Sequence, residues 1–183
     1  MSYDSIGRRY AKALFEIGKE EGSLAALSSQ ITAFAQIYAS NEELRLALDN
    51  PLVTEDAKRQ IVVEIGQRLG FGQTASRALR LVTERRRLRV LPDIAKHLGL
   101  LVDVDANVER ASVVSAVPLS EAYLRKLRTE LERSTGKKVE LTQSIDPSLI
   151  AGVVAKVGDR VIDGSLRARL AGFRHARFEL ESS

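Results

Sequence analysis

The chain has 183 residues, of which 44% are hydrophobic and 28% are charged, and it contains no cysteine. This balance is that of an ordinary globular protein, and it excludes an intrinsically disordered chain. The lack of cysteine excludes disulfide scaffolds, zinc–thiolate sites, iron–sulfur clusters and cysteine nucleophiles. The formal net charge is +4, which is only weak support for an acidic partner.

The sequence gives no sign of a membrane span or of a targeting segment. No run of about 18 apolar residues is present. The first residues have neither the apolar core of a signal peptide nor the long Arg- and Ser-rich stretch of a transit peptide. We therefore expect a cytosolic protein, or one that is held peripherally at a membrane.

Residues 1–105 predict an all-helical domain with six helices. Apolar residues recur there at steps of three and four, which is the spacing of one helix face. The six faces begin at Ile6, Leu24, Leu44, Ile61, Leu79 and Ile94.

Cap and breaker residues divide these helices. Gly22 and Gly70 are suited to end helices, and the dipeptide Asn50-Pro51 ends another. Ser23 and Thr54 are N-cap candidates. Ser40, with Glu43 three residues later, has the spacing of a capping box, and Pro92 suits the first residue of the sixth helix.

Residues 106–183 predict a smaller α+β domain. A β-prone stretch around Val113 precedes a helix that Ser120 can cap and that Gly136 ends. Alternation at residues 139–143 indicates a strand. Residues 150–157 and 160–162 are two further strand candidates, joined by a tight hairpin turn at Gly158-Asp159. A last helix is expected to begin at Gly164-Ser165. The predicted fold is thus a six-helix bundle followed by a small α+β domain.

No catalytic constellation is recognisable, and we expect no catalytic, metal or cofactor site. The sequence has no Gly-rich phosphate loop, GxSxG elbow or HExxH motif. Asp159 and Asp163 flank a short strand and could form an acid/base pair, but turn and cap roles are favoured. We expect His97 to be partly buried and hydrogen-bonded, and His175 to be solvated.

The segment Arg85 to Arg89 is the densest basic run. It could contact phosphates of nucleic acid or of lipid headgroups, which makes a basic nucleic-acid-binding adaptor an alternative function. Its place just before Pro92 favours a helix C-terminus, where cations complement the helix dipole. No aromatic residues interleave with the arginines, so a base-stacking platform is disfavoured.

Two predicted helices carry wider apolar arcs than one core contact requires. The first has Ala11, Leu14 and Phe15 beside its main face, and the fifth combines Ala75 and Ala78 with Leu79 and Val82. Small residues permit the close approach of another helix. The two helices could therefore form a groove for an amphipathic partner helix, or the excess could be additional core.

Two segments resemble a known family. The run from Arg9 to Glu16 is similar to the opening helix of the delta subunit of rotary F-type ATP synthases, whose mitochondrial member is the oligomycin-sensitivity-conferring protein. Residues 146–166 resemble the signature of that family. Its signature positions here are Asp146, Pro147, Gly152, Gly158, Asp159, Asp163, Gly164 and Ser165. Ala151 replaces the first glycine of the usual Gly-Gly pair, and residues 84–87 replace an Asn-Gly-Arg-like stretch.

The resemblance implies a stator subunit and not an enzyme. It implies that residues 1–105 bind the N-terminal helix of an α subunit in a groove between the first and fifth helices. The candidate groove residues are then Tyr10, Ala13, Leu14, Leu79 and Val82. It also implies that residues 106–183 bind the C-terminal end of the b-type peripheral stalk, with the segment from Gly152 to Leu166 holding that domain together. The protein would lie at the cytoplasmic face of a bacterial inner membrane.

Overall fold

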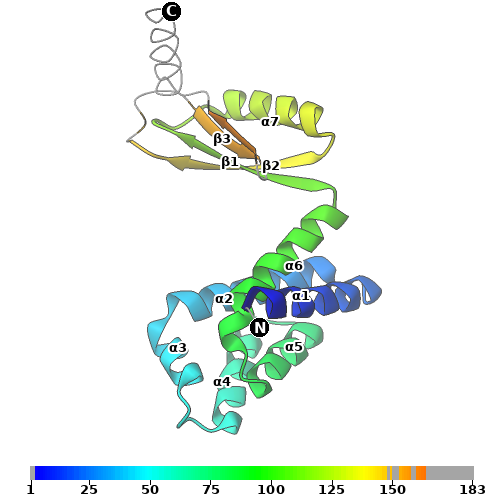
Figure 1. The fold of residues 1–183 in the computed structure, drawn as a ribbon, viewed down its shortest axis with the longest axis vertical. Helices are drawn as coiled ribbons and strands as arrows, with labels where there is room; N and C mark the ends of the chain where they lie inside the picture. The colour runs from blue at the N-terminus through cyan, green and yellow to red at the C-terminus, as the bar shows by residue number, and fades with distance from the viewer. Residues whose placement is uncertain (1–2, 148, 150–152, 158–159, 164–183) are drawn as a thin grey trace, which may run out of the picture. The chain divides into compact units, whose positions relative to one another are not determined.

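A computed structural model describes residues 3–147, 149, 153–157 and 160–163. The chain divides into two compact units, Met1–Val102 and Asp103–Ser183. The described residues of the first unit form six α-helices and one 3₁₀ turn (Figure 1). These are α1 (Tyr3–Glu20), α2 (Leu24–Ser40), α3 (Glu42–Asp49), α4 (Glu55–Arg68), α5 (Gln73–Glu84), η1 (Leu88–Val90) and α6 (Leu91–Asp105). The predicted six-helix bundle is confirmed.

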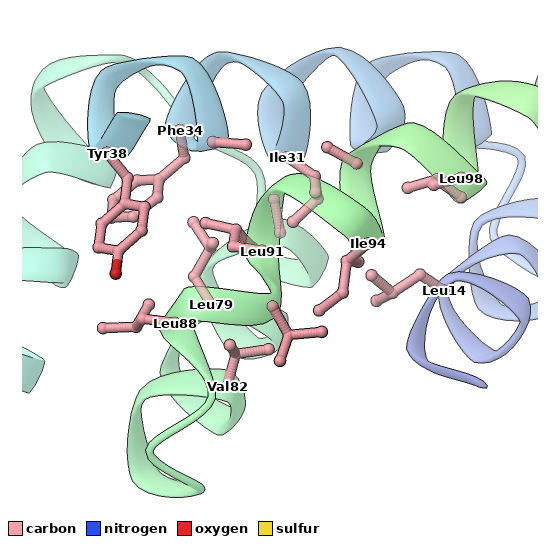
Figure 2. Packing of buried hydrophobic residues seen from close by; sticks show 14 of the residues in the cluster. Leu14, Ile31, Phe34, Tyr38, Leu79, Val82, Leu88, Leu91, Ile94 and Leu98 are labelled. Atoms are coloured by element: carbon pink, nitrogen blue, oxygen red, sulfur yellow. The ribbon is translucent and has the colours of Figure 1, made fainter. Parts of the chain in front are cut away.

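The core of the bundle is built around α2 and α6. Phe34 on α2 and Leu91, Ile94 and Leu98 on α6 are all 0% exposed. Figure 2 shows these side chains within one cluster, together with residues from α1 and α5. The second helix, whose face is predicted to begin at Leu24, buries Leu27, Ile31, Phe34 and Tyr38 at steps of three and four, and Leu24 itself is partly buried against the core.

The buried side of the first helix is shifted by one residue from the one that its large apolar residues indicate, although Leu14 belongs to both. Its buried residues are Gly7, Ala11, Leu14 and Gly18. A Cβ atom added at Gly7 would lie 2.7 Å from the Cβ of Asp93, so the backbone of α1 packs directly against the start of α6. Small residues allow the two backbones to approach this closely. The larger residues of α1 lie on either side of the contact.

The N-caps agree with the sequence in part. The Thr54 side chain accepts a hydrogen bond from the Ala57 N–H at 3.3 Å, as predicted. The capping box predicted at Ser40 is wrong, because Ser40 is the last residue of α2 and Asn41 caps α3 by accepting from the Leu44 N–H at 2.9 Å. Ser23 stands at the N-cap position of α2, but its side chain makes no capping bond.

The described part of the second unit is a four-stranded sheet with one helix. Its elements are β1 (Val108–Ser115), α7 (Glu121–Thr135), β2 (Lys138–Ile145), β3 (Val153–Val157) and β4 (Arg160–Asp163). The strand order is β2-β1-β3-β4, with β1 parallel to β2 and antiparallel to β3. Leu131 of α7 packs on Ala111 and Val139 of the sheet. The predicted α+β character is confirmed, and so are the cap at Ser120 and the helix end at Gly136, where φ is +68°.

The signature segment lies only partly within the described residues. The Asp146 N–H donates to the Ser115 carbonyl at 2.9 Å, at the end of β2, and Pro147 is exposed. Asp163 ends β4 opposite Val154 of β3. The positions outside the described residues are Gly152, Gly158, Asp159, Gly164, Ser165 and the expected last helix.

Candidate functional site

A groove between α1 and α5 in the helical unit has a volume of about 560 Å³. Its walls are two helices whose other sides pack in the core, so the residues that line it are those left beside each core contact. The lining residues are Ile6, Arg9, Tyr10, Ala13, Leu14, Ile17 and Glu21 from α1, Thr74, Arg77, Ala78, Leu81 and Val82 from α5, and Arg87.

The groove surface is mostly apolar and partly open to solvent. Leu14 and Val82 are buried, whereas Ile17 is 41% exposed and Leu81 is 44% exposed. Two exposed aliphatic side chains facing the same groove leave apolar area that a partner can remove from water. The groove is therefore suited to an amphipathic helix.

Polar contacts join the two helices at both ends of the groove. At one end the Thr74 hydroxyl donates to the Glu21 carboxylate. At the other end Arg87 donates to the Tyr10 hydroxyl at 3.3 Å, and its guanidinium carbon lies 5.7 Å from the centre of the Tyr10 ring. Because the end of α1 meets the start of α5, the two helices run antiparallel. These contacts fix the spacing between the walls.

Four of the five predicted groove residues line this groove, namely Tyr10, Ala13, Leu14 and Val82. The fifth, Leu79, is 1% exposed and packs in the core, as Figure 2 shows.

Sequence reasoning missed Leu81 and Arg77, which line the groove instead. The signal was present in α5, because Thr74, Ala78, Leu81 and Val82 recur at steps of three and four and form a stripe beside the core stripe.

The histidine at position 97 ties α6 to the start of α1. Its Nε2 lies 2.8 Å from Oδ1 of Asp4, and its side chain is 13% exposed. This hydrogen bond, with further contributions from Arg8, lowers the pKa of the Asp4 carboxyl. The predicted partly buried, hydrogen-bonded histidine is confirmed, and its role is structural. His175 lies outside the described residues.

The basic run ends α5 and contacts this chain itself. Arg85 is the C-cap of α5. The Arg86 N–H donates to the Thr83 carbonyl and the Arg87 N–H to the Val82 carbonyl, each at 2.9 Å, which is a Schellman helix ending. Arg86 occupies its left-handed position with φ +53°. The interpretation as a helix C-terminus is confirmed.

The described residues contain no group of three or more His, Asp or Glu side chains placed to hold a metal ion. The acid/base pair considered for Asp159 and Asp163 is not tested, because Asp159 lies outside the described residues. None of the helices in the described part of the chain has the length and apolar character that a membrane crossing requires.

Comparison with known proteins identifies the family. Residues 6–176 match the family model of the ATP synthase delta (OSCP) subunit. ATP synthase subunit delta of Desulfotalea psychrophila is 41% identical over 176 residues, which are 96% of this chain and 97% of that protein. The protein of the same name from Geotalea uraniireducens is 42% identical over 171 residues, or 93% and 95% of the two chains.

A solved structure has the same fold. A chain of the Toxoplasma gondii mitochondrial ATP synthase hexamer superposes with a TM-score of 0.70 and is 21% identical, covering 94% of this chain and 97% of that chain. At this identity the match shows the fold alone. The family model and the two bacterial relatives span nearly the whole sequence, and the chain therefore belongs to the ATP synthase delta (OSCP) subunit family.

Proposed function

We propose that this chain joins the catalytic head of a rotary, proton-translocating ATP synthase to its peripheral stalk, and that it holds the head through the groove between α1 and α5. As a member of the delta family, it is a stator subunit. Its task is mechanical and non-catalytic, because it must resist the torque of the rotor without transforming a substrate. The observation that carries the proposal is the apolar groove whose two walls expose Ile17 and Leu81.

The occupant of the groove is the amphipathic N-terminal helix of an α subunit. Burial of an apolar helix face gives slow dissociation, which a joint under load requires. The pairs Glu21–Thr74 and Arg87–Tyr10 support this role, because they hold the walls apart at a set distance before binding. A preformed groove loses less conformational entropy when it binds.

The charges along the groove favour an acidic partner helix. Arg9, Arg77 and Arg87 line it with a single carboxylate, that of Glu21. Among the described residues, none of the three arginines forms an ion pair, and Arg77 bonds only the Gln73 side chain. Such exposed charges affect association rate and selectivity more than affinity. We expect acidic residues on the bound helix beside its apolar face.

The same charges favour one direction for the bound helix. Arg9 and Arg87 lie at the end of the groove near Tyr10, whereas Glu21 lies at the other end with the third arginine, Arg77, one turn after Thr74. The negative C-terminus of a helix is stabilised by cations and its positive N-terminus by carboxylates. The partner therefore has its N-terminus near Glu21. A spin label on the peptide N-terminus should broaden the amide signals of residues near Glu21 and leave those near Arg9 sharp, and the opposite pattern would reject this direction.

The second compact unit supplies a separate attachment for the C-terminal end of the b-type stalk. Two units that bind different partners raise the overall strength of attachment when both bind together. The chain then lies peripherally at the cytoplasmic face of a bacterial inner membrane, and it is held there through the complex.

Calorimetric titration of the full chain with a peptide of the cognate α-subunit N-terminus tests the groove. Ala13→Asp places a carboxylate on the exposed groove wall, where a bound helix would desolvate it. We expect at least tenfold weaker binding. Ala26→Asp, at an exposed position of α2 outside the groove, is the matched control and should bind as the wild type does. Equal binding by a folded Ala13→Asp variant would remove this wall from the site.

A further inference from the structure

A second cavity lies apart from the groove, where α3, the first turn of α4 and the segment after α5 meet. We infer that it is a binding site for a phosphate-type oxyanion, with the Lys58 ammonium as its central ligand. Its volume is about 260 Å³. The lining residues are Tyr3, Leu48, Asp49, Pro51, Lys58, Thr83, Arg86, Leu88 and Arg89.

Lys58 is an uncompensated cation within the bundle. The residue is 6% exposed, and among the described residues its side chain forms no ion pair and no hydrogen bond. Its ammonium is not fully enclosed, and it lines the cavity without an acceptor in the described part of the protein, so it is available to an anion that enters there. Its position in the first turn of α4 adds to this, since the positive end of the helix dipole disfavours a cation there. An anion in the cavity supplies the missing acceptor and offsets the unfavourable charge at the helix start.

The nearby carboxylates bind other donors, although Glu55 Oε2 is buried without a hydrogen-bond partner among the described residues. Glu55 Oε1 lies 2.8 Å from Arg86 Nε, and Asp56 Oδ1 lies 2.9 Å from Arg59 Nη2. Asp49 is the carboxylate that lines the cavity. Its Oδ1 accepts from the Tyr38 hydroxyl at 2.7 Å, and its Oδ2 accepts from Arg89 Nε at 2.9 Å. None of these acids neutralises Lys58.

Two arginines complete the cationic lining. Arg86 and Arg89 are each held by a carboxylate through Nε. Their other guanidinium N–H groups remain as donors for a second acceptor, because a guanidinium carries five. The cavity is thus lined by three cations, Lys58, Arg86 and Arg89, and by one carboxylate that is already hydrogen-bonded on both oxygens.

The left-handed backbone of Arg86, which belongs to the Schellman ending of α5, sets the course of its side chain. A non-glycine residue in the left-handed region costs about 1–2 kcal/mol, and Arg86 holds φ +53° at a helix end where glycine is preferred. This conformation places a long guanidinium side chain on the wall of the cavity.

The ligand that fits this lining is a compact oxyanion. A phosphate group offers several charged acceptor oxygens to one ammonium and two guanidinium groups, and charge-assisted hydrogen bonds of this type are the strong ones. The group can arrive as inorganic phosphate or as the phosphoryl group of a nucleotide. The site is independent of the groove and of its proposed occupant, since no residue lines both cavities.

The site can be tested by following the amide NMR signals of the ¹⁵N-labelled full chain while inorganic phosphate is added. Phosphate replaces chloride in the buffer so that the ionic strength stays constant. We expect saturable shifts of amide signals around Lys58, Arg86 and Arg89. Lys58→Met keeps the length of the side chain and removes the charge, and it should weaken binding about tenfold or more. Lys12→Met, at an exposed position of α1 outside the cavity, should leave binding unchanged.

Titrations with ADP and ATP distinguish the two sources. Tighter binding of a nucleotide than of phosphate, with shifts around the same residues, would identify a phosphoryl group of a nucleotide. Equal or weaker binding would identify free phosphate. If Lys58→Met does not fold, Arg86→Gly removes a cation and suits the backbone, and it should also weaken binding. Shifts that do not saturate, or that are spread over the surface, would overturn the site, as would unchanged binding by a folded Lys58→Met variant.

Discussion

Truncation of Leu81 to alanine separates partner binding from folding. This side chain lines the groove and remains 44% exposed in the free chain. Complete burial of a leucine contributes about 1.5–3 kcal/mol. The part still open to solvent therefore corresponds to about 1 kcal/mol that only a bound partner can recover. Leu81→Ala should raise the Kd for the α-subunit helix roughly fivefold.

Calorimetry with the full chain and the peptide measures this change. Leu46→Ala is the matched control, because Leu46 is a 63% exposed leucine on α3 that does not line the groove. Its Kd should equal that of the wild type. Both variants should unfold within about 0.5 kcal/mol of the wild type, since both side chains are largely at the surface.

Two results would refute this reasoning. An unchanged Kd for Leu81→Ala would show that the partner does not cover the exposed stripe of α5. An equal loss of affinity in Leu46→Ala would show that the effect comes from general surface hydrophobicity and not from the groove.

Three further predictions concern the fold itself. Gly7→Ala should destabilise the chain by about 1–3 kcal/mol, because the new methyl group meets Asp93. Gly99→Ala adds a methyl group to open space within α6 and should stabilise the chain by about 0.8–1 kcal/mol. Urea unfolding measures both variants, and equal changes in the free energy of unfolding would contradict the tight α1 contact. The pKa of Asp4 is lowered below its ordinary 3.8, so the stability that this carboxylate contributes is present above that value and is lost as the pH falls through the lowered pKa. Asp4→Asn should therefore be less stable than the wild type at neutral pH and equally stable in strong acid. A difference in the free energy of unfolding that stays the same at every pH would reject the assignment. Arg86→Gly relieves left-handed strain of about 1–2 kcal/mol and removes the ion pair between the 75% exposed Arg86 and the 33% exposed Glu55. We expect the free energy of unfolding to rise by about 0.5–1 kcal/mol, and a lower urea midpoint would show the reverse.

Local structure could be predicted where a residue acts through its immediate neighbours. Ser120 and Gly136 mark the two ends of α7, because a hydroxyl can cap the third N–H of a helix and only glycine enters the left-handed region freely. The face of α2 from Leu27 to Tyr38 could also be read, since its large apolar residues recur at steps of three and four. The family could be recognised for a related reason, because its signature is a continuous run of residues.

The sequence alone left open which side of α1 faces the core. Its large residues Ile6 and Tyr10 suggest one side, but they are only partly buried, whereas Gly7 and Ala11 are buried. Burial here follows the distance between two backbones, and a hydrophobic count assigns glycine no weight. The same ambiguity affects α5, where two apolar stripes lie side by side. The sequence assigned Leu79 to the groove, whereas the structure places Leu79 in the core and Leu81 in the groove.

The cavity around Lys58 depended entirely on tertiary structure. Lys58 belongs to α4 and its companions Arg86 and Arg89 follow α5, so no spacing in the sequence places them together. Periodicity and cap chemistry act over a few residues, and they determined the helices, the strands and most of their ends. Which side chains face each other across the bundle depends on how closely whole elements approach, and that is decided only when all of them pack at once.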